Sequence, residues 1–185
     1  MELLEAIYQR RAVRAYKPQA VDRDLIDVLI DAAIQAPSAV NSQPWHFSII
    51  RDASLLASIA DTAKAHMLER LAKDAGAGHF HEQLGDPNFQ IFYHAPVLIV
   101  ISANSGDWVV EDATLAAQNL MLAACDLGLG TCWIGFAQSW LRTTEGRATL
   151  CLPDGYLPVA PIIVGHPQLA APVVPRKPTS VDWRD

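Results

Sequence analysis

The sequence lacks the excess of basic residues that binding to nucleic acid or to a membrane surface normally needs. Its 14 Lys and Arg residues are outnumbered by 20 Asp and Glu residues, and the net charge is −6. The amino terminus, MELLEAIYQRR, lacks the basic region and apolar core of a signal peptide. No apolar run approaches the roughly 20 residues that cross a bilayer. We therefore expect a soluble, cytoplasmic protein that binds neither nucleic acid nor membrane.

Cysteine and histidine are too sparse to indicate a disulfide framework or a metal site. Cys125, Cys132 and Cys151 have no CxxC spacing and no matching second pair, so we expect buried, reduced thiols. Only His79 and His81 are close enough in sequence to form a metal pair, whereas a complete site needs about three or four ligands. We predict no metal site.

Several catalytic motifs are also missing. No GxSxG, Walker or HExxH pattern is present, so no motif supports hydrolysis at a serine, phosphoryl transfer or zinc proteolysis. The glycines of GLGTCWIG, residues 128–135, are spaced GxGxxxxG and follow a predicted helix, which excludes a dinucleotide-binding fingerprint. Gly130 and Gly135 are better interpreted as bracketing a strand end where the backbone approaches a ligand.

The residues that are present suit one α+β domain over residues 1–185. Apolar residues make up 51% of the chain, and no repeat, low-complexity tract or linker divides it. Short apolar runs predict strands at residues 45–50, 95–103, 130–136 and 158–165. The run at 95–103 has the composition of a central strand that is covered on both faces.

Apolar residues at helical spacing predict helices in the first half of the chain. The first helix should pack one face on the core through Leu3, Leu4, Ile7 and Tyr8. It would place three arginines at or beyond its end, where cations complement the helix dipole: Arg10, Arg11 and Arg14. A second helix is capped by Asp22, ends before Pro37 and buries Leu25, Ile26, Leu29, Ile30 and Ala33. A third covers residues 54–71, and residues 74–90 are interpreted as a variable cover over a pocket.

The segment from Glu111 to Leu127 predicts a helix that is apolar almost all round, with Gly128 at its end. Such a helix must be buried on nearly every side. A second copy of the chain would bury it most easily, which predicts a homodimer; a central helix in a monomeric sandwich is the alternative. The tail from Gln168 has Pro at 172, 175 and 178, so it cannot form a regular internal element and is expected to wrap over the partner subunit.

The dodecapeptide APSAVNSQPWHF, residues 36–47, has the composition of a ligand-facing loop. Ser38, Asn41, Ser42 and Gln43 offer short polar groups that suit the hydrogen-bonding edge of a flavin. An ordinary polar loop between a helix and a strand is the alternative for this segment. Together with RRAVR at residues 10–14, whose guanidinium groups can bind a phosphate or remain solvated, the loop points to a flavin cofactor.

Five segments in order closely resemble the FMN-dependent nitroreductase family. They are RRAVRAY at 10–16, APSAVNSQPWHF at 36–47, FYHAPVLIVISA at 92–103, DATLAAQNLMLAACDLGLGTCWIGF at 112–136 and PVAPIIVGHP at 158–167. The resemblance implies a three-layer α/β/α sandwich with a mixed, mainly antiparallel sheet. It also implies an intertwined homodimer with two FMN sites at the interface.

The resemblance assigns residues to the cofactor. Arg10 would bind the FMN phosphate, Arg14 would lie near the phosphate–ribityl chain or the pyrimidine edge, and Arg11 would contribute its backbone. Ala12 stands where the family often has serine, so it can offer only its backbone. The other subunit would contribute Pro37, Ser38, Ala39, Asn41 and Gln43. The flavin's reactive nitrogen would face a backbone amide of Trp133, Ile134 or Gly135. In the tail, Arg176 matches a second phosphate-binding cation, and Lys177 is a weaker candidate.

The implied activity is a two-step, ping-pong hydride exchange. NADPH or NADH would reduce FMN and leave, and a nitroaromatic, quinone or similar electrophile would then take the electrons. No side chain is expected to act as a nucleophile, and Arg14 would stabilise the developing negative charge. Two alternatives remain: a relative that consumes its flavin to form a benzimidazole, and a non-catalytic flavin-binding module.

Overall fold

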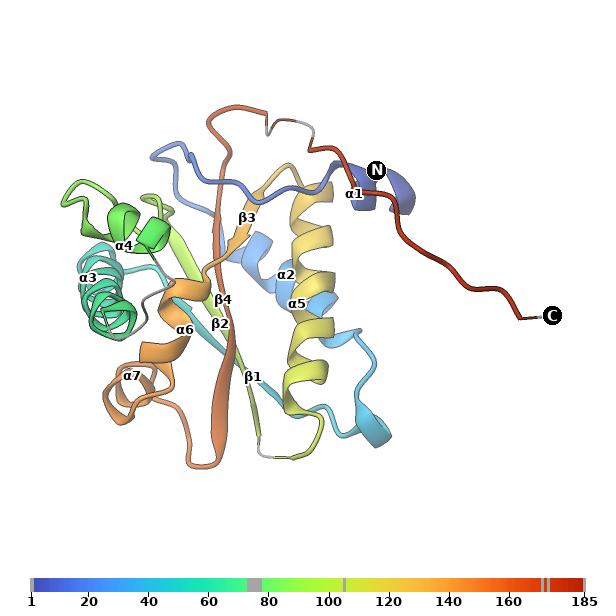
Figure 1. Cartoon of the computed structure of the whole chain (residues 1–185). Coiled ribbons are helices and arrows are strands. Elements are labelled where there is room, and N and C mark those ends of the chain that lie inside the picture. The colour runs from blue at the N-terminus through green and yellow to red at the C-terminus, as the bar shows by residue number, and fades with distance from the viewer. Residues whose placement is uncertain (1, 73–77, 105, 171, 173, 185) are drawn as a thin grey trace.

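A computed structural model describes residues 2–72, 78–104, 106–170, 172 and 174–184 (Figure 1). Its elements in chain order are α1 (Leu3–Gln9), α2 (Arg23–Ile34), the 3-10 turn η1 (Ala39–Asn41), β1 (Trp45–Ile50), α3 (Ala53–Leu71), α4 (Gly78–Gly85), β2 (Val97–Asn104), α5 (Val109–Asp126), β3 (Gly130–Trp133), α6 (Gly135–Leu141), α7 (Thr144–Thr149) and β4 (Tyr156–Gly165). Within these residues, no helix combines the length and apolar character that crossing a membrane requires.

The expected three-layer sandwich is confirmed. The sheet has the order β1-β2-β4-β3, and each neighbouring pair is antiparallel. Helices α2 and α5 cover one face, and α3, α4, α6 and α7 lie on the other (Figure 1). Among the described residues, the sheet's mixed character is limited to one isolated parallel bridge between Ala12 and Thr131.

The two cores lie on the two faces of β2. Residues 97–103 of this strand are all buried, as predicted for a strand covered on both sides. Alternate residues belong to different clusters: Ile99 and Ile101 pack toward α2 and α5, whereas Leu98 and Val100 pack toward α3 and α6. This period of two is the expected consequence of strand geometry.

Helix α1 forms where it was predicted but does not bury the face that was predicted. Leu3, Leu4 and Tyr8 are 67%, 64% and 71% exposed, and only Ala6 of this helix is buried. The prediction of a face on the core of the same chain is therefore wrong. Apolar spacing specifies that a face should be covered, but it does not say by which element or by which chain.

Helix α5 is buried on one side only within a single chain. Its inner face, which includes Ala116, Ala117 and Leu120, is fully buried, whereas Val110 and Leu115 are exposed. The alternative of a central helix enclosed by one monomer therefore does not hold. Gly128 ends the helix as predicted: its φ is 72°, its amide donates to the Cys125 carbonyl at 3.1 Å, and the Leu129 amide donates to Ala124 at 2.8 Å.

One helix, one strand end and one capping contact differ from the predictions. The segment 74–90 contains the short helix α4 where only irregular cover was expected. The strand predicted at 130–136 ends at Trp133, because Gly135 begins α6. Asp22 stands at the N-cap position of α2, but its side chain makes no capping hydrogen bond. The described residues beyond 168 form no helix or strand, as the prolines predicted.

The segment that follows α1 is fixed along the free edge of β3. The Val13 amide donates to the Thr131 carbonyl at 2.9 Å, beside the Ala12–Thr131 bridge. Further along, the Lys17 amide donates to the His166 carbonyl at 2.9 Å, and the Tyr16 hydroxyl donates back to the Val13 carbonyl at 2.8 Å. Residues 12–17 are thus held by β3 and by the end of β4.

Two paired glycines make room for this segment. Gly130 and Gly165 are partners in the β3–β4 ladder. A Cβ on Gly130 would lie 2.8 Å from the Val13 side chain, and one on Gly165 would lie 2.7 Å from the Tyr16 ring. Gly130 therefore approaches Val13 and not a ligand, which corrects the interpretation made from the sequence. The arginine segment depends on the absence of both side chains.

Gly130→Ala is expected to lower the free energy of unfolding by about 1–3 kcal/mol, because the added methyl overpacks against Val13. Urea unfolding measures the change. Gly85→Ala is the control, since nothing lies within 4 Å of the added Cβ there. Equal stability of the two variants would contradict the close packing of Val13 over Gly130.

Candidate functional site

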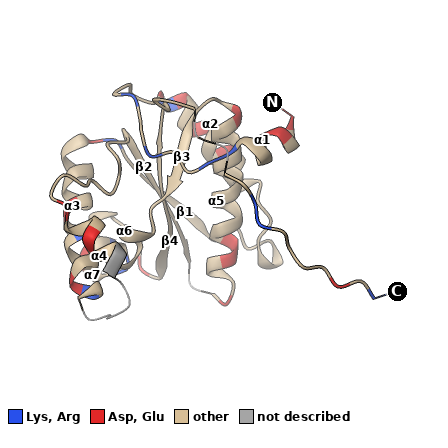
Figure 2. Ribbon diagram, turned by 45° about the horizontal axis from the view of Figure 1, so that its top comes forward, with Lys and Arg blue, Asp and Glu red and all other residues tan. Residues whose placement is uncertain are grey.

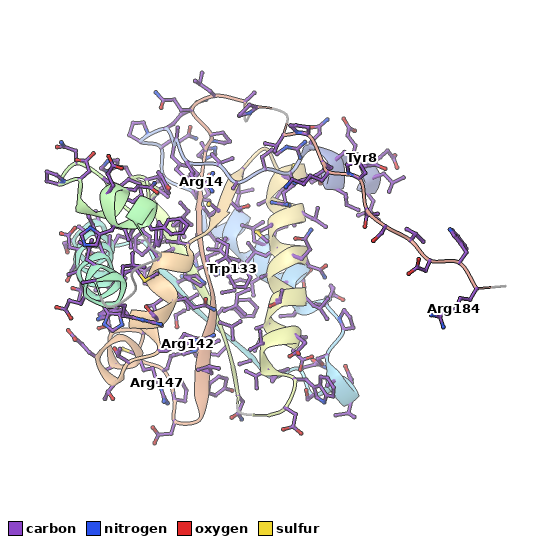
Figure 3. All side chains as sticks on the ribbon, in the orientation of Figure 1. Tyr8, Arg14, Trp133, Arg142, Arg147 and Arg184 are labelled. Atoms are coloured by element: carbon purple, nitrogen blue, oxygen red, sulfur yellow. The ribbon has the colours of Figure 1, made fainter. Side chains whose placement is uncertain are left out.

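The three predicted arginines are held differently. The Arg11 Nη1 donates to the carbonyls of Tyr8 and Arg10 at 2.6 and 2.7 Å, so its side chain folds back on the end of α1. The Arg14 guanidinium carbon lies 6.0 Å from the centre of the Tyr93 ring. Figure 3 shows Arg14 near β3, above Trp133 and between the two helical layers.

Arg14 and Arg10 both act on the buried Cys132 thiol of β3. Burial raises the pKa of this thiol, and the two guanidinium groups oppose the rise. Burial likewise raises the pKa of Cys125 on α5, against the opposing charges of Arg10 and Arg11. Arg10 therefore exerts its charge at the junction of β3 with the carboxyl end of α5.

The three cysteines are free thiols. Cys151 is exposed and Cys125 is half-buried, so the prediction that all three would be buried was wrong.

Two cavities meet at Arg14. The first has a volume of ≈ 350 Å³ and is lined by Arg14, Met67, Ile91, Tyr93 and Cys132–Phe136. The second, of ≈ 410 Å³, runs along Arg11–Ala15 and residues 169–174 of the tail that the structure describes. Each is within the range of about 300–1,000 Å³ that is typical of small-molecule sites. A third cavity, of ≈ 150 Å³, adjoins Arg10, Arg11 and the end of α5.

The segment Trp133–Gly135 forms one wall of the first cavity. The Ile134 amide is already engaged, because it donates to the Pro161 carbonyl at 2.8 Å. Gly135 is exposed, and nothing lies within 4 Å of the place where its Cβ would be. It is also the first residue of α6, where the backbone amide has no partner within the helix. The backbone of Gly135 is therefore open to a ligand, whereas the Ile134 amide is not.

The loop predicted to face a ligand has strained backbone conformations and is fixed by hydrogen bonds within it. Val40, Asn41 and Gln43 adopt left-handed φ values of 48°, 56° and 47°. Asparagine tolerates this region, whereas a β-branched valine is strained there by about 1–3 kcal/mol. Within the loop, the Gln43 amide donates to Ser38 Oγ at 2.9 Å and the Gln43 side-chain amide donates to Asn41 Oδ1 at 3.2 Å. Val40 is 100% exposed at the tip.

This loop is tied to the amino end of α5. The Ala39 amide donates to Oδ1 of the buried Asp112, in the first turn of the helix, at 2.9 Å. The loop also lines a cavity of ≈ 390 Å³ together with Asn104, Trp108 and Tyr156. Pro37 lies two residues beyond the C-cap of α2, so it closes that helix as predicted.

The two halves of the predicted site lie at opposite ends of α5. An 18-residue helix is about 27 Å long, with the loop at its first turn and Arg10 and Arg11 at its last. Figure 2 shows the same separation by charge: the red first turn of α5 lies at one end, and the blue segment after α1 lies near the other. One chain therefore does not bring all the predicted residues together. Arg176 and Lys177 are exposed on the extended tail (Figure 1).

Several lining residues were not predicted from the sequence. Met67 of α3, Ile91, Tyr93 and Phe136 line the first cavity. Tyr93 and His94 have left-handed φ values of 52° and 57°, although neither is glycine. No spacing or composition in the sequence marks these residues, because long-range packing, such as that of α3 against α6, brings them together. Among the described residues, no group of three or more His, Cys, Asp or Glu side chains could hold a metal ion; the His79 side chain is outside the described set.

Comparison with known proteins agrees with this architecture. The model of the Nitroreductase family matches residues 7–166. A protein of Methanothermobacter thermautotrophicus that is assigned as an NADH dehydrogenase/NAD(P)H nitroreductase is 34% identical over 173 residues, which are 90% of this chain and 78% of that protein.

Two solved structures share the fold at 26% identity. A nitroreductase with bound FMN from Desulfitobacterium hafniense has a TM-score of 0.82 and is covered over 100% of its chain, against 98% of this one. A nitroreductase with bound FMN from Bacteroides fragilis has a TM-score of 0.79, with 95% and 98% of the two chains covered. With a family model that matches most of its length, this chain belongs to the nitroreductase family.

Proposed function

We propose that the protein binds FMN along the edge of β3 and uses NAD(P)H to reduce nitroaromatics, quinones or similar electrophilic acceptors. The observation that carries the proposal is the pair of cavities that share Arg14, one reaching the open backbone of Gly135 and the other following Arg11–Ala15. Two relatives of known structure have FMN bound, and the relative from Methanothermobacter thermautotrophicus is assigned as an NAD(P)H nitroreductase, which supports the cofactor and the reductant.

The residues present fit the two ends of FMN. A phosphate is best held by guanidinium groups, and Arg10 would be its main cation. The Arg11 Nη1 is occupied by two carbonyls of its own chain, while the buried Nε has no partner among the described residues. Arg11 and Ala12 would contribute through their backbones. The planar ring would lie against Trp133, Ile134 and Gly135. Because the Ile134 amide is engaged, the amide of Gly135 would donate to the ring's reactive nitrogen.

The proposed hydride exchange needs no side chain as a nucleophile. Bound FMN would supply the redox step, accepting hydride from the nicotinamide and passing electrons to the acceptor. Arg14 would place a fixed positive charge where negative charge develops. NAD(P)H and the acceptor would occupy the same open face in turn, which makes the exchange ping-pong and the range of acceptors broad.

We further propose that the site is completed by a second copy of the chain. Pro37, Ser38, Ala39, Asn41 and Gln43 lie a helix length away from Arg10 and Arg14 in their own chain, so they would serve the FMN of the partner. The exposed apolar side chains on α1 and α5 supply an interface for such a homodimer: Leu3, Leu4, Tyr8, Val110 and Leu115. The proline-containing tail would extend over the partner and bring Arg176 to the phosphate.

The direct test is a visible spectrum of the purified protein before and after anaerobic addition of NADPH or NADH. A flavin band that bleaches, with repeated turnover when an acceptor is added, is the expected result. Loss of flavin with oxygen would indicate the flavin-consuming alternative, and binding without turnover would indicate the non-catalytic module. A protein that stays colourless after incubation with FMN would refute the cofactor assignment.

Arg14→Ala is expected to slow the reduction of bound FMN by NAD(P)H about 10²-fold, because the charge that stabilises the reduced ring is lost. Stopped-flow absorbance measures this rate. Arg147→Ala is the matched control, since Arg147 lies on α7, away from Arg14 in Figure 3, and lines neither cavity. Equal rates in the two variants would remove Arg14 from the site.

A mixing experiment tests the composite site. Arg14→Ala and the double variant Ser38→Ala/Asn41→Gly are each expected to bind FMN weakly as homodimers; glycine keeps the left-handed backbone at position 41. In a two-fold dimer that assembles at random, half the molecules are mixed, and each has one intact site. Co-expression should therefore restore about a quarter of the high-affinity sites. No recovery above the average of the two variants would contradict a shared site.

A further inference from the structure

Tyr93 has a conformation that the local sequence does not favour. It and His94 are consecutive non-glycine residues in the left-handed region, each at a cost of about 1–2 kcal/mol. The surrounding structure enforces this turn. The Tyr93 amide donates to the Gln90 carbonyl at 2.9 Å, the Ala95 amide donates to Phe92 at 2.9 Å, and Phe92 is 1% exposed. A strained turn that the fold maintains at a cavity wall is a reason to look for a function.

The packing around the turn orients the Tyr93 ring. The Phe89 ring meets it edge to face, with centroids 5.6 Å apart and an interplanar angle of 80°. Phe89 is itself held by Lys64 of α3, whose Nζ donates to the Phe89 carbonyl at 2.7 Å and to the Asp86 carbonyl at 2.6 Å. The ring is therefore fixed from α3, and its face is presented to Arg14 at 6.0 Å, within the range of a cation–π contact.

We propose that Tyr93 is a positioning residue: the face of its ring holds the Arg14 guanidinium at the wall of the cavity without neutralising its charge. A carboxylate in the same place would fix the cation but cancel most of its field. An aromatic face attracts the cation through its quadrupole and leaves the full positive charge available to a ligand. The inference rests on the proposed function, in which Arg14 stabilises reduced FMN.

Three titratable neighbours of Arg14 are also uncharged at neutral pH. Burial raises the pKa of the Tyr93 hydroxyl, of the Tyr16 hydroxyl and of the Cys132 thiol. Arg14 opposes each rise by its charge and, at Tyr93 and Cys132, also by a side-chain hydrogen bond. The Arg14 side chain is exposed, and these groups beside it keep their protons. Because these neighbours carry no negative charge, they do not neutralise the Arg14 guanidinium, and its charge can act on a ligand.

Two substitutions separate the ring face from the bulk of the side chain. Tyr93→Phe keeps the aromatic face and loses the hydroxyl, whereas Tyr93→Leu keeps apolar volume and loses the face. The first readout needs no cofactor: the Arg14 Hε resonance in ¹⁵N-labelled apoprotein. We expect a ring-current shift of this proton in the wild type and in Tyr93→Phe, and its loss in Tyr93→Leu. A wild-type Hε without such a shift would overturn the proposal even if neither variant folds.

The second readout is the ratio of FMN affinities in the reduced and oxidised states, which a purely structural change would leave unaltered. In Tyr93→Leu the preference for reduced FMN should fall about two- to fivefold, and in Tyr93→Phe it should stay at the wild-type value. An unchanged preference in Tyr93→Leu, or equal losses in both variants, would overturn the role of the ring face. If the wild type binds no FMN, the proposed function fails, while the apoprotein spectra still decide whether Tyr93 holds Arg14.

Discussion

The packing of residues 12–17 across the ends of β3 and β4 is the constraint on which the candidate site depends. Val13 and Tyr16 occupy the space left by the paired glycines Gly130 and Gly165, and the Val13 amide completes the free edge of β3. This contact sets where Arg10 and Arg14 emerge relative to the strand that ends at Trp133. A shift of one residue would turn the Arg14 side chain to the other side of the segment and away from the cavity.

The second constraint is the length of α5. Helix α5 separates the arginine segment from the strained loop 37–43. In one chain, apolar side chains of both α1 and α5 are also exposed. Both features are costly for an isolated molecule, since apolar surface and a left-handed valine each raise its free energy. A two-fold arrangement of two chains would cover the apolar faces and bring each loop to the other chain's arginines, so one assembly accounts for both observations.

Local patterns predicted most of the elements, and the order of the motifs predicted the family and the sandwich. The strands at 45–50 and 95–103, the end of α5 at Gly128 and the break at Pro37 follow from alternation, helix periodicity and turn chemistry. The burial of α1 did not, because periodicity does not identify the partner surface. Tyr93 and Met67 were missed for a different reason: α3 and the turn before β2 reach the same cavity as the end of β3 only through long-range packing, which no short segment encodes.

Analytical ultracentrifugation of the FMN-loaded protein, followed at the flavin absorption band, tests most directly whether two chains build each site. The account predicts that all bound flavin sediments with the mass of two 20.2 kDa chains, and that dilution into single chains releases it. Flavin that sediments in stoichiometric amounts with a single 20.2 kDa chain would contradict a site shared between copies.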